Sequence, residues 1–489
     1  MLPQAENLWT ISEAAHLINR AGFGGSPAEI TALHALGREK AVDSLVTPTE
    51  LLDAFPPLPW TCDEQVQADL RLVLEKRAAD RKAKRELTPE AAEELRREVG
   101  KKIRMENRRR TREAQDAWFR RMLTTQAPLR EKMTLFWHDH FASSVQKVKQ
   151  PVLMVRQNEM FRRGAFGSFK ELTQQILLDP AMAVFLDIQS SKKDQPNENF
   201  TRELMELFTL GEGYYTEQDI REAARAFTGY QFKLESGHVI HNKRQWDATD
   251  KTIFGKTGPF NGQDVIELIF QKKQTARFMA QKLWEFFVAE KPSTATLNSL
   301  ATSFLKHDFR TGPVLREIFM SQEFYAVANL RSQIKSPLHY LIALLKQLEI
   351  STPPAGFPII AQQQLGQVLF SPPNVAGWDW GQAWITTNTL LARYNIAGVL
   401  TKGIEDSPPK QSRGWVGPDY EHLAPRSLRE NPADLVQSLI LRFFQSPLPS
   451  KAQDTFTEYA FTKKGAIFTN KETAELCHLM LSTPQYQLY

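Results

Sequence analysis

Apolar residues follow helical spacing along most of the chain. One clear example begins at Pro128 and places the following side chains on a single helical face: Leu129, Met133, Phe136, Trp137 and His140. This spacing predicts an amphipathic helix whose apolar face includes His140, so we expect that histidine to be buried. Because periods near 3.6 residues dominate, the sequence predicts a mainly α fold, a large multi-helix bundle.

Residues 230–260 depart from this helical pattern. YQFKL is followed by Glu235-Ser236-Gly237 and then by HVIH. Two short alternating runs around a glycine-containing turn are typical of a β-hairpin. We therefore predict one small β-hairpin near 230–241, inside an insertion near 230–260.

Residues 63–124 predict a protruding basic hairpin of two antiparallel helices. Thr88 and Pro89 separate two helical stretches, as an N-cap and a first helical residue. Apolar residues are sparse in both stretches, so only a thin seam can be buried. Residues 71–112 hold 16 basic and 8 acidic side chains, a net charge of +8 against +5 for the whole chain. This one segment therefore makes the chain basic.

The length of 489 residues permits several domains and a large core. We predict three parts: N-terminal helices with a glycine-rich turn (1–62), the charged hairpin (63–124) and a main helical domain (125–489). The two cysteines, Cys62 and Cys477, supply neither a disulfide framework nor a cysteine-based zinc site.

The chain carries no apolar run near the roughly 20 residues that a membrane span needs. The first residues show no basic segment followed by an apolar one, which is the pattern of a secretory signal peptide. For the sequence as given, we therefore expect a cytoplasmic location. A trimmed periplasmic or exported protein would show the same pattern, and that alternative stays open.

The segment NENFTRELMELF holds the most concentrated set of polar side chains. With 100° of rotation per residue, Leu204, Leu207 and Phe208 fall near Phe200 and form a buried stripe. The polar side chains cluster along the adjacent edge: Asn199, Arg202, Glu203 and Glu206. Two carboxylates one turn apart perturb each other's pKa, as acid–base and metal sites require. A structural Arg–Glu network linking this helix to a neighbour is the alternative.

The two glutamates are expected to differ. Glu203 lies nearer the apolar stripe, so burial should raise its pKa and suit it to proton transfer. Arg202 lies about 40° from Glu206 on the helix and is expected to neutralise it. Further along the chain, Thr216 and Asp219 predict a capping box, and Glu222 and Arg225 are spaced to form an ion pair.

Two further motifs have structural interpretations beside functional ones. His138 and His140 are two residues apart on a predicted helix and point about 200° apart, which disfavours joint metal binding. Trp378, Trp380 and Trp384 follow a Pro-Pro-Asn turn. They could form a sugar-stacking platform, although a wedge in the core is favoured.

Several of these segments together resemble the bacterial family called domain of unknown function 1800. They are AAHLINRAGFG, LFWHDHFA, NENFTRELMELFTLGEGYYTEQDIREAARAFTG, KTIFGKTGPFNGQDVI, ARFMAQKLWEFFV and PPNVAGWDWGQAWITTNTLLAR. The resemblance spans about residue 12 to about residue 486. It implies a large, mostly helical and often exported protein, often encoded beside an exported sulfatase-like or phosphatase-like hydrolase. It implies no particular reaction.

The chain departs from the family pattern at two places. Members usually carry a histidine where this chain has Gly164, and a His-Asp pair where it has Trp246-Asp247. Whether Gly164 and Trp246 mark a lost site stays open at the level of the sequence.

Three functions remain in competition. The first is an enzyme, hydrolase-like or with metal-assisted acid–base chemistry, whose polar pocket combines five residues: His140, Asn199, Arg202, Glu203 and Glu206. The second is a non-catalytic partner or scaffold of the sulfatase-like or phosphatase-like hydrolase. The third is a polyanion binder that uses the basic hairpin. Nucleic acid is disfavoured, because no aromatic residue lies between Trp60 and Trp118. Substrate, metal, cofactor and oligomeric state stay open.

Overall fold

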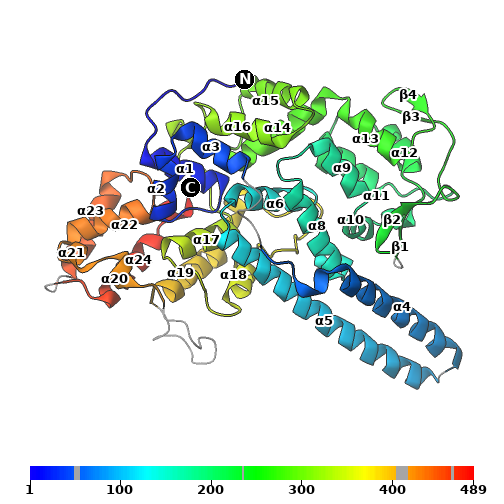
Figure 1. The fold of residues 1–489 in the computed structure, drawn as a ribbon, viewed down its shortest axis with the longest axis horizontal. Coiled ribbons are helices and arrows are strands. Elements are labelled where there is room, and N and C mark those ends of the chain that lie inside the picture. Colours follow the sequence, from blue (N-terminus) through cyan, green and yellow to red (C-terminus); the bar gives the residue numbers. More distant parts are fainter. Residues whose placement is uncertain (49–54, 87, 234–235, 403–416, 464–466) are drawn as a thin grey trace.

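Helices make up most of the chain, which confirms the predicted mainly α fold. The computed structural model describes the chain apart from residues 49–54, 87, 234–235, 403–416 and 464–466. In the described part, helices are accompanied by two two-stranded antiparallel sheets (Figure 1).

The N-terminal part consists of short capped helices: α1 (Ile11–Ala21), α2 (Pro27–Ala35) and α3 (Arg38–Val46). Thr10 and Glu13 form a reciprocal capping box at the start of α1, and Ser26 and Glu29 form another at α2. These helices contribute buried apolar side chains to the same core cluster as residues far along the chain.

The charged hairpin consists of α4 (Asp63–Glu86) and α5 (Pro89–Thr124), preceded by the short 3₁₀-helix η2 (Pro59–Thr61). Thr88 caps α5 and Pro89 is its first residue, as the sequence predicts. The two helices run side by side away from the rest of the molecule (Figure 1). Only the C-terminal end of α5 enters the core, through Trp118, Phe119 and Met122.

Helix α6 (Pro128–His140) is fully buried at every position except Arg130 and Asp139, which are partly buried. His140 is buried, as its place in the helical pattern predicts. The elements that follow are short: α7 (Val145–Val148), α8 (Pro151–Arg163), α9 (Phe169–Leu177), α10 (Pro180–Phe185) and the 3₁₀-helix η3 (Ile188–Ser190).

The polar segment folds as three consecutive elements: α11 (Asn199–Glu203), the π-helix η4 (Leu204–Thr209) and α12 (Glu217–Ala226). The sheets follow: β1 (Tyr230–Lys233) pairs with β2 (His238–His241), and β3 (Lys251–Ile253) pairs with β4 (Lys256–Gly258). The first sheet is the predicted β-hairpin. The second was not predicted, because three-residue strands are too short to show alternation.

The remainder of the described chain is helical. Its α-helices are α13 (Gly262–Phe270), α14 (Lys273–Phe287), α15 (Thr294–Lys306), α16 (Thr311–Met320), α17 (Pro337–Gln347), α18 (Phe357–Leu365), α19 (Thr387–Lys402), α20 (Tyr420–Leu423), α21 (Arg426–Arg429), α22 (Pro432–Phe443), α23 (Ser450–Thr462) and α24 (Asn470–Leu481). Its 3₁₀-helices are η5 (Val327–Asn329), η6 (Gly381–Trp384) and η7 (Pro484–Gln487).

The buried apolar side chains form two clusters. One joins α1–α3 to residues from α6 through α16. The other joins the end of α5 and residues of α7, α8 and α10 to α17–α20 and α22–α24, so α8 and α10 contribute to both. Helix α6 serves both, because Met133 and Phe136 belong to the first cluster and Leu135 to the second. No helix in the described ranges combines the length and apolar character that crossing a membrane requires.

Candidate functional site

The predicted glutamate face lies on an irregular helical segment. Within η4 the backbone winds more widely than in an α-helix, and the Leu210 N–H bonds to the Met205 carbonyl, five residues back, at 2.9 Å. The Thr209 hydroxyl donates to the Leu204 carbonyl at 2.5 Å and so satisfies a second backbone acceptor. π-Helical turns are rare and frequently mark functional sites, so this segment is the leading candidate.

Glu203 is the last residue of α11 and is partly buried. Among the described residues, no group donates a hydrogen bond to its carboxylate. Burial raises the pKa of Glu203, and the nearby Glu206 carboxylate raises it further, while Arg202 acts in the opposite direction. The direction matches the sequence prediction that Glu203 is the desolvated acid of the pair.

Glu206 obtains its partner from the loop before α12 rather than from Arg202. The Tyr215 hydroxyl donates to Glu206 Oε2 at 2.7 Å. Arg202 instead forms two 2.8 Å bonds with the Glu217 carboxylate and a 3.3 Å contact with Glu198. The expectation that Arg202 neutralises Glu206 is therefore wrong, because partners on α12 and one turn back on the chain, Glu217 and Glu198, hold the guanidinium instead.

Asn199 and His140 lie in different surroundings. Asn199 is exposed, and its side-chain amide donates to the Leu186 carbonyl at 3.5 Å. His140 is buried beneath η4, where Nε2 donates to the Phe208 carbonyl at 3.0 Å. Burial holds the pKa of His140 well below its ordinary value, and Lys282 lowers it further, so the ring is neutral.

Of the five predicted residues, the structure brings Glu203 and Glu206 together. His140 supports the same segment from beneath, through the backbone of Phe208. Arg202 and Asn199 belong to separate surface contacts. The five side chains do not line one shared cleft in the described part of the chain.

Asp139 is a candidate that sequence reasoning missed. Its Oδ1 accepts a hydrogen bond from the Trp378 backbone N–H at 2.7 Å, and the half-exposed Trp380 side chain is near enough to help lower the pKa of this carboxyl. Burial raises the pKa of Asp139 to about 7, against opposing effects from the two tryptophans and Lys282. The available signal was its position between two histidines that drew attention first.

The tryptophan motif divides between core and surface around Asp139. Trp378 and Trp384 are buried, as the core interpretation expects, while Trp380 is half exposed. Gly377 adopts a left-handed φ of +91°, and a side chain at this position would collide with Asp139. The turn therefore depends on glycine to bring the Trp378 N–H to the carboxylate.

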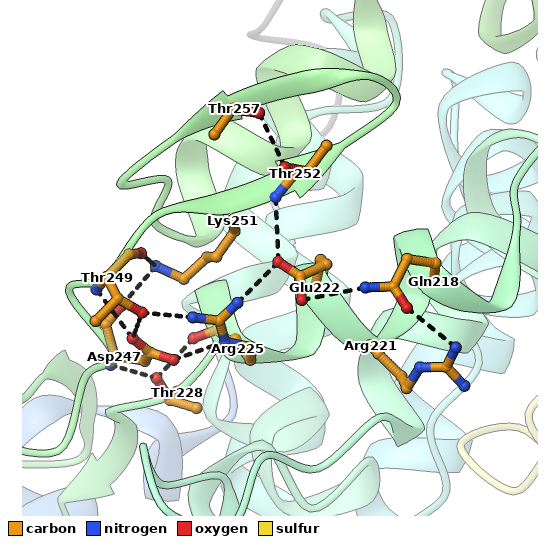
Figure 2. Close-up of polar contacts among 10 residues, drawn as sticks. All are labelled: Gln218, Arg221, Glu222, Arg225, Thr228, Asp247, Thr249, Lys251, Thr252 and Thr257. Atoms are coloured by element: carbon orange, nitrogen blue, oxygen red, sulfur yellow. Dashed lines mark hydrogen bonds and ion pairs between the residues drawn. The ribbon is translucent and has the colours of Figure 1, made fainter.

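A second polar network connects α12 with the loop before β3, as Figure 2 shows. Arg225 bonds to both Glu222 and Asp247 at 2.8 Å, which confirms the predicted Glu222–Arg225 pair. Lys251 is 1% exposed, and its Nζ donates to the carbonyls of Asp247 at 2.5 Å and Thr249 at 2.8 Å. The arrangement fixes the loop to α12, and Asp247 has a structural role in it.

The two positions that depart from the family pattern have different neighbours. Gly164 ends α8, where an added Cβ would lie 3.1 Å from Leu172. Trp246 packs against His241 and lies beside the Lys251 ammonium. Across the described ranges, no group of three or more His, Cys, Asp or Glu side chains is placed to hold a metal ion.

Comparison with models of protein families shows which family this chain belongs to. A family model described as "Protein of unknown function (DUF1800)" matches residues 16–488. The chain belongs to the DUF1800 family. No curated protein and no solved structure matches it. DUF1800 is a family of uncharacterised function, so the candidate chemistry rests on the residues described above.

Proposed function

We propose that this DUF1800 chain is an enzyme of hydrolase type that uses acid–base chemistry at Glu203 and Glu206. The supporting observation is a partly buried glutamate with no donor among the described residues, beside a second glutamate and at the start of a π-helix. Such an acid keeps its proton to higher pH than an exposed glutamate. Proton transfer near neutral pH favours a carboxyl with this property.

The two acids divide the work in this proposal. Glu203 donates its proton to the leaving group of a bound substrate and becomes a carboxylate. Glu206, oriented by the Tyr215 hydroxyl, positions the attacking water and accepts its proton. Pairs of carboxyls in unequal environments are the usual arrangement for such exchange.

The other predicted residues act as positioning groups. His140 holds the end of η4 through the Phe208 carbonyl. Arg202 ties α11 to α12 through Glu217 and keeps the α11 end of the pair in place. Asn199 anchors the start of α11 to the Leu186 carbonyl.

The first test is hydrolysis of phenyl phosphate, phenyl sulfate and phenyl acetate by the purified chain, because the basic phenolate leaving group needs the proton that Glu203 supplies. Glu203→Gln should abolish turnover of any ester the wild type cleaves, while Glu206→Gln should reduce it less. Glu198→Gln is the matched control, because Glu198 belongs to an exposed ion pair with Arg202. Equal turnover by Glu203→Gln and wild type would contradict the proposal.

The protruding hairpin supports a second candidate, a non-catalytic partner of a sulfatase-like or phosphatase-like hydrolase. Basic side chains are exposed along α5, at Arg97, Lys101, Lys102, Arg104 and Arg108. An extended basic arm suits docking to an acidic protein surface. Removal of residues 66–112 should then abolish co-purification with a sulfatase-like or phosphatase-like hydrolase expressed together with the chain.

The same arm supports the third candidate, a polyanion binder. This function predicts that heparin binds the chain with a steep dependence on salt and that Lys101→Glu/Lys102→Glu weakens it. Heparin binding without capture of the hydrolase would favour the polyanion function over the partner function.

A further inference from the structure

Four cationic side chains are buried where α1, α6, α19 and the segment before α17 approach one another. Arg20 is 0% exposed, Lys132 3%, Lys335 2% and Arg393 1%. No ion pair links any of them to an acidic side chain in the described part of the chain. Buried cations without an opposite charge are strongly disfavoured, so the cluster requires an explanation.

Neutral groups hold two of these cations. The Lys335 Nζ donates to the Tyr486 carbonyl at 2.7 Å and lies 3.5 Å from the centre of the Tyr486 ring. Arg393 donates to Gln487 at 2.9 Å and to the Lys335 carbonyl at 2.8 Å. Carbonyl dipoles and aromatic faces stabilise a cation, but they do not offset burial, which lowers the pKa of Lys335 well below its ordinary value, and Arg393 and Arg331 lower it further.

The other two cations are less completely paired. Arg20 donates through Nη2 to Asn329 and Ser332, whereas Nε and Nη1 find no partner among the described residues. The Lys132 Nζ lies 3.3 Å from His339 Nδ1, and burial together with Arg20 lowers the pKa of Lys132 to about 7. Burial is the main cause of this lowered pKa, and the neighbouring positive charge of Arg20 adds to it.

A pocket opens beside this cluster. It is small and partly open to solvent, and its lining includes Ser12, His16, Arg331, Lys335 and Tyr489. No aspartate or glutamate lines it. Tyr489 connects pocket and cluster, because the Arg20 guanidinium lies 4.7 Å from the centre of its ring.

We infer that this pocket binds a small anion, a phosphate-like oxyanion or a carboxylate, whose charge compensates the buried cations. In this proposal Lys335, a lining residue whose ammonium has donors beyond the one bonded to Tyr486, regains its charge when the anion binds. Arg331, partly exposed in the same lining, supplies a second cationic contact. Arg20 and Lys132 lie deeper in the protein and attract the anion electrostatically without contacting it.

The test is isothermal titration of the full chain with inorganic phosphate, and separately with acetate, against potassium chloride at matched ionic strength. We expect saturable binding of phosphate or acetate that exceeds the signal with chloride. The anion with the higher affinity shows whether the pocket prefers a phosphate-like oxyanion or a carboxylate. Lys335→Met should weaken that binding by roughly tenfold or more, which is the contribution of a charged hydrogen bond. Lys306→Met, at an exposed lysine, is the matched control and should bind like the wild type.

Arg331→Gln keeps the test decisive if Lys335→Met fails to fold. This residue is less buried, and its loss should also weaken the anion, whereas the exposed Arg310→Gln should not. Absence of saturable binding by both anions would overturn the inference. Unchanged affinity in Lys335→Met, or in Arg331→Gln where Lys335→Met cannot be measured, would overturn it as well.

Discussion

At the scale of single residues, neighbours in sequence were predictable and distant partners were not. Glu222 and Arg225 are three residues apart on one helix, and their ion pair follows from helical spacing. The hydrogen bond from the Trp378 N–H to Asp139 joins residues 239 positions apart, and no local sequence pattern predicts it. Arg202 shows the same limit, because Glu217 lies 15 positions away on the next helix.

Glu203→Gln should stabilise the chain slightly at neutral pH. The folded-state pKa of Glu203 is raised, so the folded chain binds this proton more tightly than the unfolded chain does. Stability is therefore lost as pH rises above the unfolded pKa, and the amide removes that loss. Because the group is partly exposed, the gain should stay near 0.5 kcal/mol or less.

Thermal melts at neutral and acidic pH would check this. The stabilisation should vanish at acidic pH, where the wild-type carboxyl is protonated in both states. Glu198→Gln provides the contrast, because it removes half of an exposed ion pair. A large drop in Tm for Glu203→Gln at neutral pH would instead indicate that Glu203 is part of a structural network.

Asp139→Asn should flatten the dependence of stability on pH. The pKa of Asp139 is raised from 3.8 to about 7, so the wild type loses stability as pH rises through that window. The amide keeps an acceptor for the Trp378 N–H and removes the titration. Urea unfolding at about pH 4 and about pH 8 should differ less in the variant, by roughly 1–3 kcal/mol. The exposed Asp379→Asn should retain the wild-type dependence.

At the scale of elements, the sequence predicts those that obey one clear period. Helical spacing predicts α6, and alternation around a glycine turn predicts β1 and β2. The π-helix η4 was not predicted, because its residues also fit an ordinary α-helix. The candidate site was located correctly as a segment, but its geometry depends on this departure from regular winding.

Deletion of residues 66–112 with a short linker should leave a folded chain. The hairpin projects away from the rest of the molecule (Figure 1), and among residues 74–112 most of the described side chains are exposed or only partly buried. The deletion spares the buried end of α5. Circular dichroism and thermal melting should show a cooperative transition near that of the wild type.

The matched comparison is Phe119→Ala, which creates a cavity in the core part of the same helix. Phe119 is 0% exposed, so its truncation should reduce stability by roughly 3–5 kcal/mol. A deletion variant that aggregates and shows no cooperative unfolding would contradict this prediction. It would show that the hairpin is needed for the stability of the core.

At the scale of the whole molecule, the two hydrophobic clusters share α6, α8 and α10, so we expect them to unfold together. Met133 belongs to one cluster and Leu135 to the other, although the two residues are one helical turn or less apart. Losing either cluster would expose one side of a helix that is buried almost throughout. The predicted division into residues 1–62, 63–124 and 125–489 would then describe segments of one cooperative unit.

Met133→Ala and Leu135→Ala form the test, because each creates a cavity in a different cluster. Both residues are almost fully buried, and each truncation should cost roughly 2–5 kcal/mol. Since α6 couples the clusters, both variants should lower the midpoint of the same single transition in calorimetry, with tryptophan fluorescence and circular dichroism coincident. Two separated transitions, each moved by only one of the variants, would show that the clusters unfold independently and that α6 does not couple them.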